Sequence, residues 1–392
     1  MQGPLSHPRL AIILILAVAA AGVLPVALPW IWDLDHPPSA ALRILAKILS
    51  ILLVPLVLAT CWRVDVGLAG RRKLVLFVLL VLVACGLEDL HHTQVDEGHY
   101  FALTQYADNT QWQRTMHRSV IALSPDALPH SYRFLPDGLI AFLEWPTGSF
   151  EWARALYRLT FVFMLVLAIY YLASLYLPPS PAMVVVFIYA FVYPFSIRYY
   201  AGQPTDPASH LSFILAFIFL ELGWFLPLAV ILVAGILAKE SVAVVALYYA
   251  LFEAHGRRGW LRAGVLVTSV LGVALLLRLG IRRGDFGYRE VSGVSLGHVV
   301  VNLSLTDKWP RQLLFTVGAL LPFAVLGWQR APERVRNLTL VIGPALIVTN
   351  VFFSWMHEAR NFIPLTVLLT IIGVRWMSAA YPGTERALAL PR

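Results

Sequence analysis

Charged residues are scarce in this chain. Asp, Glu, Lys and Arg make up 13% of its 392 residues, whereas a water-soluble domain carries roughly 25% of them. Hydrophobic residues reach 59%, and the mean hydropathy is +0.73. A water-soluble core cannot absorb so large an apolar excess, so the composition excludes an ordinary soluble domain and predicts an integral membrane protein.

Cysteine is also scarce, because the chain has only Cys61 and Cys85, both inside apolar runs. Thiols in such surroundings behave as small hydrophobic groups, so we expect neither a disulfide framework nor a cysteine metal site. The sequence also lacks internal repeats and low-complexity segments. Many transporters are built from internal repeats, so their absence weighs against that class.

The net charge is +8, but the basic residues lie in short loops between apolar runs. Recognition of nucleic acid needs basic residues clustered on one exposed face with interleaved aromatic residues. We therefore expect no nucleic-acid partner and assign the basic residues to membrane topology.

Long uncharged apolar runs predict membrane-spanning helices. A helix needs about 20 residues, at a rise of about 1.5 Å per residue, to cross the hydrocarbon layer of about 30 Å. These runs also lack the alternation of apolar and polar residues that is typical of barrel strands. The first run is too long for a signal peptide and ends at Trp30-Ile31-Trp32, which offers no small-residue cleavage site. We expect an all-α polytopic bundle of about ten full spans, near 10–32, 41–62, 74–87, 156–177, 182–200, 208–222, 262–280, 312–328, 338–355 and 362–380.

The apolar segment 225–252 is interrupted at its centre by Lys239 and Glu240. Positive residues collect in cytoplasmic loops, and the basic loops at 71–73 and 330–336 share that side only if segment 225–252 enters the membrane and returns. We therefore predict a broken or fold-back helix pair that meets at Lys239-Glu240 near the outer side. The protein is then a multi-pass protein of the inner (plasma) membrane with cytoplasmic termini.

The outer loop 88–155 holds a dense group of carboxylates, imidazoles and aromatic rings, beginning with Asp96-Glu97-Gly98-His99-Tyr100. On a helix, Asp96 and Tyr100 lie one turn apart and can face one cavity. The alternative is a solvated acidic loop followed by an interfacial helix. The histidines show no strict zinc spacing, so we assign no metal site. A divalent cation held by Asp96 or Glu97 stays an alternative.

Arg133, in Tyr132-Arg133-Phe134-Leu135-Pro136, lies beside a short apolar stretch. Its planar guanidinium suits a phosphate or a carboxylate, and the alternative is an interface arginine that reaches back to water. Arg154 and Arg158 lie at the start of a span, and we expect their side chains to reach back to water in the same way.

Lys239-Glu240 is the strongest signal, because charges inside an apolar segment are costly and mark functional sites. Its alternative is a mutual ion pair that only ends two helices. Two smaller motifs share the outer side. Thr205-Asp206-Pro207 is typical of a capped helix start, and His357-Glu358-Ala359-Arg360 occupies a short turn between two spans.

The order of these motifs resembles that of the GT-C superfamily of membrane glycosyltransferases, which use polyprenyl-phosphate sugar donors. In that family an acidic pair and a tyrosine begin the first large outer loop, as in Asp96-Glu97-Gly98-His99-Tyr100, and a juxtamembrane helix follows. A basic residue with prolines, similar to Arg133 with Pro136, then binds the lipid phosphate. The later elements are similar to Thr205-Asp206-Pro207, Lys239-Glu240, and Glu358 with Arg360.

The resemblance implies an inverting glycosyltransferase that moves a sugar from a polyprenyl-phosphate donor to an acceptor hydroxyl on the outer face. Membrane lipid is the other expected partner, and the residues do not identify the acceptor. Asp96, and Glu97 next, would act as the catalytic base. The substrate-binding residues would be His99, Tyr100, Tyr132, Arg133, Asp206, Lys239, Glu240, His357, Glu358 and Arg360.

This resemblance assigns residues 74–380 to a GT-C-like catalytic domain. Residues 1–73 form two additional N-terminal spans, and 381–392 form a cytoplasmic tail. The additional spans, and the lack of a soluble domain after the last span, depart from the family pattern. A transporter or lipid-linked sugar flippase with a broken-helix site at Lys239/Glu240 is the rival hypothesis, and a non-catalytic membrane scaffold is the third. The carboxylate-rich outer loop favours the enzyme.

Overall fold

The computed structural model describes residues 68–91, 109–124, 130–197, 204–281, 296–306 and 309–380. Within these ranges the regular structure is helical, and seven helices are long and apolar enough to cross a membrane. This confirms an all-α, multi-pass membrane protein. The seven are α3 (Gly70–His91), α6 (Phe150–Ser174), α7 (Pro179–Ser196), α11 (Gly256–Ile281), the composite helix Trp309–Arg330, α15 (Glu333–Phe353) and α16 (Ile363–Ala380).

Seven of the ten predicted spans overlap these helices, with ends that differ by up to six residues, and the two near 10–32 and 41–62 lie outside the described residues. The predicted span 208–222 is α8 (Thr205–Glu221), whose 17 residues extend for about 26 Å. Helix α3 runs on to His91 and α6 begins at Phe150. Both helices therefore extend into the predicted outer loop 88–155.

The composite helix is built from four short pieces rather than one continuous α-helix. These are α13 (Trp309–Thr316), η6 (Gly318–Leu320), α14 (Leu321–Gly327) and η7 (Trp328–Arg330). It packs along α16 and α7. Gly327 permits the close approach to α16, because a Cβ atom there would lie 2.7 Å from the carbonyl oxygen of Ile372.

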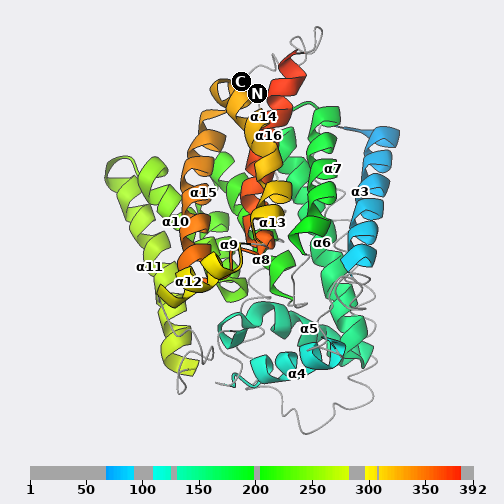
Figure 1. Ribbon diagram of the computed structural model, residues 1–392, viewed down its shortest axis with the longest axis vertical. Coiled ribbons are helices and arrows are strands. Elements are labelled where there is room, and N and C mark those ends of the chain that lie inside the picture. Colours follow the sequence, from blue (N-terminus) through cyan, green and yellow to red (C-terminus); the bar gives the residue numbers. More distant parts are fainter. Residues whose placement is uncertain are drawn as a thin grey trace.

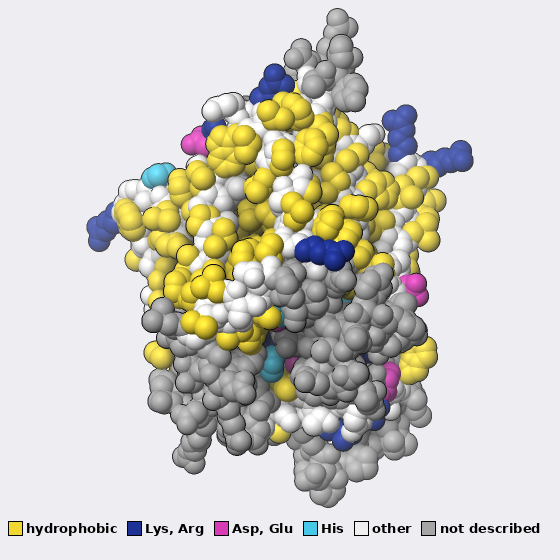
Figure 2. Space-filling view, viewed as in Figure 1, with side chains coloured by type: hydrophobic (Ala, Val, Ile, Leu, Met, Phe, Trp, Pro, Cys, Tyr) yellow, Lys and Arg dark blue, Asp and Glu magenta, His cyan; other side chains and the backbone are white. Residues whose placement is uncertain are grey.

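In Figure 1, α3, α6 and α7 stand on one side of the bundle and α11 stands on the other, with α8 and α9 (Phe225–Ala238) between them. Apolar side chains cover much of the visible helical part, and several basic side chains lie around its upper rim (Figure 2). The outward sides of α3, α11 and the composite helix carry exposed leucine and valine residues. Such surfaces are suited to contact with lipid.

The chain folds back at Lys239. Helix α9 ends at Ala238, and η4 (Glu240–Ala243), α10 (Val244–Tyr248) and η5 (Tyr249–Glu253) return along the bundle. Arg334 holds the end of the fold-back that lies away from Lys239, because it pairs with Glu221 at 3.1 Å and with Glu253 at 2.9 Å. The start and the end of the fold-back therefore lie together, which confirms the predicted return.

Close packing makes this fold-back possible. A Cβ atom on Gly235 would lie 2.6 Å from Val242 Cγ1 and 3.0 Å from Ser212 Cβ. Glycine at this position therefore lets α9 contact both η4 and α8, and a larger residue would push the two arms of the fold-back apart.

Helices α4 (Asn109–Ile121) and α5 (Phe134–Thr147) form a separate layer at the lower end of Figure 1. The imidazole of buried His117 on α4 lies 2.9 Å from Asp137 on α5 and 3.4 Å from Glu144. This layer lies beside the ends of α6 and α9, because α5 contacts both helices.

The expectation that Arg154 and Arg158 reach water was wrong. Arg158 is 2% exposed and pairs with Glu88 at 3.0 Å, while buried Arg154 bonds to Gln113 on α4. The Glu88–Arg158 pair also explains why α3 continues past the expected boundary, because the arginine compensates the carboxylate in the helix.

Candidate functional site

Charged side chains from distant parts of the chain meet at the end of α9. We call this group the charge cluster. It contains three cations and three carboxylates, so its formal charge is zero. Its members are Arg133, Asp206, Lys239, Glu240, Glu358 and Arg360.

Asp206 is the centre of the cluster. Lys239 Nζ donates to Asp206 Oδ1 at 3.3 Å, and Arg360 Nε lies 3.1 Å from Asp206 Oδ2. All three residues are less than 10% exposed. Charges in such surroundings are retained only when they compensate one another, so Asp206 holds two cations that would otherwise be very costly to bury.

Asp206 does not cap its helix, contrary to the sequence interpretation. Helix α8 begins at Thr205, and Asp206 lies in the first turn. An acidic side chain is favourable there because the helix N-terminus carries partial positive charge. The main partners of Asp206 are nevertheless the cations of other segments.

The break in α9 places Lys239. Its backbone is extended, with φ −165° and ψ 130°, so the helix stops and the side chain turns toward α8 and η8 (Ala359–Phe362). Lys239 also donates to Asn361. Glu240 pairs with Arg133 at 2.9 Å. The two charges at the break thus have partners on other segments, which goes against the alternative of a mutual ion pair.

The connection between α15 and α16 supplies Glu358, Arg360 and Asn361. Arg360 donates to Glu358 at 2.9 Å, and His210 on α8 donates through Nε2 to the Arg360 carbonyl at 3.0 Å. Asn302 on α12 (Leu296–Ser304) accepts from Met356 N and donates to the Ser354 carbonyl. These bonds fix a connection that has only a short 3₁₀ helix of its own.

Arg133, Glu240 and Glu358 form the part of the cluster that water reaches. Their side chains are 21%, 28% and 18% exposed, against 4% for Arg360 and 9% for Asp206. Arg133 follows η3 (His130–Tyr132) and directly precedes α5. An anion arriving from water would therefore meet the Arg133 guanidinium first and compete with Glu240 for it.

Two neighbouring groups have shifted pKa values. Desolvation of His130 and the charge of Arg133 lower its pKa to about 3, so its imidazole is neutral near pH 7. Burial would raise the pKa of Glu358, but the charges of Arg360 and Lys239 outweigh it and hold that pKa below its usual range. Glu358 therefore remains ionised beside a neutral histidine.

The remaining predicted residues divide into two groups. Tyr132 is buried next to Arg133, and His357 is half-buried beside the ring of Trp355 at 5.8 Å. Asp96, Glu97, His99 and Tyr100 lie outside the described residues. In the described part of the chain, no group of three or more His, Cys, Asp or Glu side chains is placed to hold a metal ion.

Sequence reasoning missed His210, Asn361 and the Glu88–Arg158 pair. His210 follows Asp206 by four residues, so both belong to one face of α8, and that spacing was an available signal. A small cavity of about 10 Å³ lies between Arg158, Tyr189, Asp206 and Arg360. It has room for about one water molecule.

The arrangement combines buried, fixed charges with one exchangeable ion pair at the rim. It can bind an anionic group at Arg133 and release the Glu240 carboxylate at the same time. Comparison of the chain with protein-family models, with curated proteins and with solved structures gave no match.

Proposed function

We propose that this protein is an inverting glycosyltransferase, which transfers a sugar from a polyprenyl-phosphate donor to an acceptor hydroxyl on the outer face of the membrane. The observation that supports it most is the meeting of Arg133, Lys239 and Arg360 at one end of the bundle. A lipid-linked phosphate needs cations at the depth where its headgroup leaves the hydrocarbon layer.

In this proposal Arg133 binds the donor phosphate by two parallel hydrogen bonds. Lys239 and Arg360 lie deeper and keep the site positive once the phosphate has displaced Glu240. Their field stabilises the charge that develops on the phosphate as it leaves. Asp206 and Glu358 hold these two cations in place, and so act as positioning residues.

The chemical step is a single displacement. The acceptor oxygen forms a bond to the anomeric carbon while the bond from that carbon to the phosphate oxygen breaks. The bonding electrons leave with the polyprenyl phosphate, and a carboxylate takes the acceptor proton as general base. We assign that carboxylate to Asp96, and to Glu97 next.

Binding of a polyprenyl phosphate to purified protein in detergent tests the phosphate site. Arg133→Gln removes a charge-assisted pair worth about 1.5–3 kcal/mol, so we expect affinity to fall by roughly 10- to 100-fold. Arg118→Gln, on the exposed side of α4, is the control and should leave binding unchanged. Equal affinity of the Arg133 variant and the control would contradict the phosphate role.

Transfer activity in membranes tests the base. Asp96→Asn or Glu97→Gln should abolish transfer of a labelled sugar while polyprenyl-phosphate binding persists. If both single variants keep full activity, the assignment of the base is wrong.

Transport is the second candidate, and the clamped fold-back favours it. Ion pairs hold this element at both ends, by Lys239–Asp206 and by Arg334 with Glu221 and Glu253, as expected of a gated passage. Reconstituted vesicles separate the two functions. Movement of a lipid-linked sugar between leaflets without loss of its sugar would support transport and contradict the transferase.

A further inference from the structure

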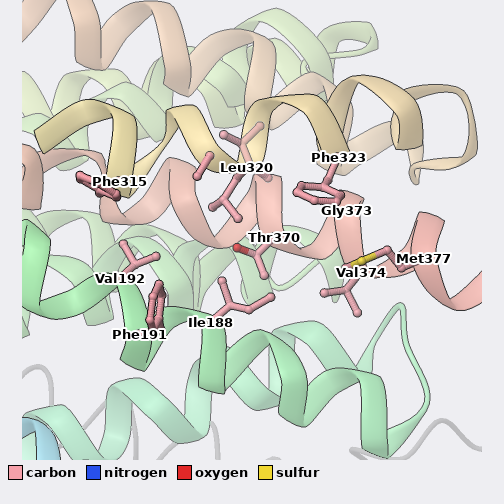
Figure 3. A pocket seen from close by; sticks show the side chains of 12 residues that line it. Ile188, Phe191, Val192, Phe315, Leu320, Phe323, Thr370, Gly373, Val374 and Met377 are labelled. Carbon is pink, nitrogen blue, oxygen red and sulfur yellow. The ribbon is translucent and has the colours of Figure 1, made fainter. Parts of the chain in front are cut away.

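An apolar groove runs along α16 on the side that faces α7 and the composite helix. Its volume is about 300 Å³, and hydrophobic residues and Thr370 line it. Figure 3 shows Phe315 near one end and Met377 near the other, with Phe191 and Phe323 on opposite sides. The groove is distinct from the charge cluster, and it shares no lining residue with the small cavity that lies beside the cluster.

The rim of the groove is exposed. Phe191, Phe315 and Phe323 at its rim are 71%, 41% and 42% exposed, although they belong to helices that are long and apolar enough to span the membrane. Near Phe315 the ring of Phe195 stacks on it, with centroids 4.9 Å apart. At Gly373 a Cβ atom would lie 3.0 Å from Phe323 Cβ. The space is thus elongated, and accessible from the side.

Two arginines, Arg330 and Arg375, lie beyond the Met377 end of the groove. Met377 lines the groove, and Arg375, two residues before it, donates to the carbonyl of Arg330 at 2.9 Å and to that of Tyr176 at 2.8 Å. Arg330 itself is exposed. No carboxylate of the described residues forms an ion pair with either guanidinium, so within that part of the chain neither positive charge is neutralised.

We propose that this groove binds an anionic glycerophospholipid of the surrounding leaflet. One hydrocarbon chain fills the groove from Met377 toward Phe315, and the phosphate lies at Arg330 and Arg375. The charge of the two arginines selects an anionic headgroup over a zwitterionic one. The proposal is independent of the proposed function, because the groove uses none of the cluster residues and lies toward the opposite end of the bundle.

Native mass spectrometry of the detergent-purified chain can test this site, with phosphatidylglycerol and phosphatidylcholine as probes. The wild type should bind phosphatidylglycerol more tightly, by about fivefold for each arginine. Arg330→Gln should lose about fivefold of that preference, and the Arg330→Gln/Arg375→Gln variant should lose all of it. Arg72→Gln, an exposed arginine at the start of α3, should keep it.

Filling the groove gives the second test. Ala319 lines the groove and is exposed, so Ala319→Trp should weaken binding of both lipids at least fivefold without disturbing the core. Val325→Trp is the matched control, because Val325 is 70% exposed and lies outside the groove. Equal affinities of the two lipids for the wild type would overturn the proposal. So would equal binding of lipid by the two tryptophan variants.

Discussion

Asp206 and Arg360 are in direct contact across 154 residues of sequence, with Arg360 Nε 3.1 Å from Asp206 Oδ2. The same carboxylate also accepts from Lys239. One buried anion therefore organises two buried cations, one from the fold-back and one from η8 in the connection between α15 and α16.

Asp206→Asn should destabilise the protein strongly, because Lys239 and Arg360 keep their charges and lose their partner. Removal of one member of a buried ion pair typically costs about 3–5 kcal/mol. Thermal unfolding in detergent should show a clear fall of Tm. Asp206→Asn/Lys239→Met removes one anion and one cation together and should recover part of the loss. A double variant less stable than Asp206→Asn would contradict the charge-balance argument.

The contact between α4 and α5 should weaken as the pH rises. Burial alone would lower the pKa of His117, but its bonds to Asp137 and Glu144 outweigh that effect and raise the pKa to about 9. Burial also raises the pKa of Asp137. Both shifts mean that the folded pair binds protons more tightly than the unfolded chain. The stabilisation that His117 contributes is complete below about pH 6.5 and is lost as the pH passes about 9.

Hydrogen exchange of residues 109–121 can measure this change. Amide protection in α4, corrected for the intrinsic effect of pH, should be lower at pH 9.5 than at pH 6. His117→Gln should remove most of the difference, since the glutamine does not titrate. Protection that is independent of pH in the wild type would show that the His117–Asp137 contact does not hold α4 in place.

Replacement of Arg334 by lysine should weaken the contact at the far end of the fold-back. Its guanidinium donates through Nε and Nη2 to Glu253 and through Nη1 to Glu221, and a single ammonium cannot reproduce this fork. The side chain is 31% exposed, so we expect a loss of only about 1 kcal/mol, seen as a lower Tm. Arg336→Lys is the control. Equal Tm values for the two variants would exclude a clamp at this end.

Cysteine labelling should establish the orientation of the bundle. In a background with Cys61→Ala and Cys85→Ala, a membrane-impermeant maleimide added from outside should label Glu97→Cys. It should label Arg72→Cys only after the membrane is permeabilised, because the basic start of α3 is expected in the cytoplasm. The reverse pattern would place the charge cluster on the cytoplasmic side and exclude an outer active site.

Hydropathy predicted the helical segments of the described chain well, because each span-length helix is a long apolar run with few charged residues. The fold-back at Lys239 was also predictable, since only a return keeps both basic loops on one side. Helix ends were less predictable. Glu88 marked a boundary by its charge alone, and only the contact with Arg158, 70 residues later, explains why the helix continues.

The candidate site shows the same limit. Arg133, Asp206, Lys239 and Arg360 stood out as charges near apolar runs, but their sequence positions gave no information on which of them pair. His210 and Asn361 carry no charge near pH 7 by their residue type, so no hydropathy argument could select them. Pairing is a property of the packed bundle and depends on contacts between distant segments.

The spacing of the cluster along the chain sets an order of assembly. Lys239 follows Asp206 by 33 residues, so these two charges can meet soon after synthesis, while Asn361 follows Lys239 by 122 residues. Until then Lys239 has its ion pair with Asp206 but lacks the hydrogen bond to Asn361. We therefore expect the fold-back to reach its final position in the membrane only after α16 has inserted. A chain truncated before residue 358 should then be degraded by membrane quality control.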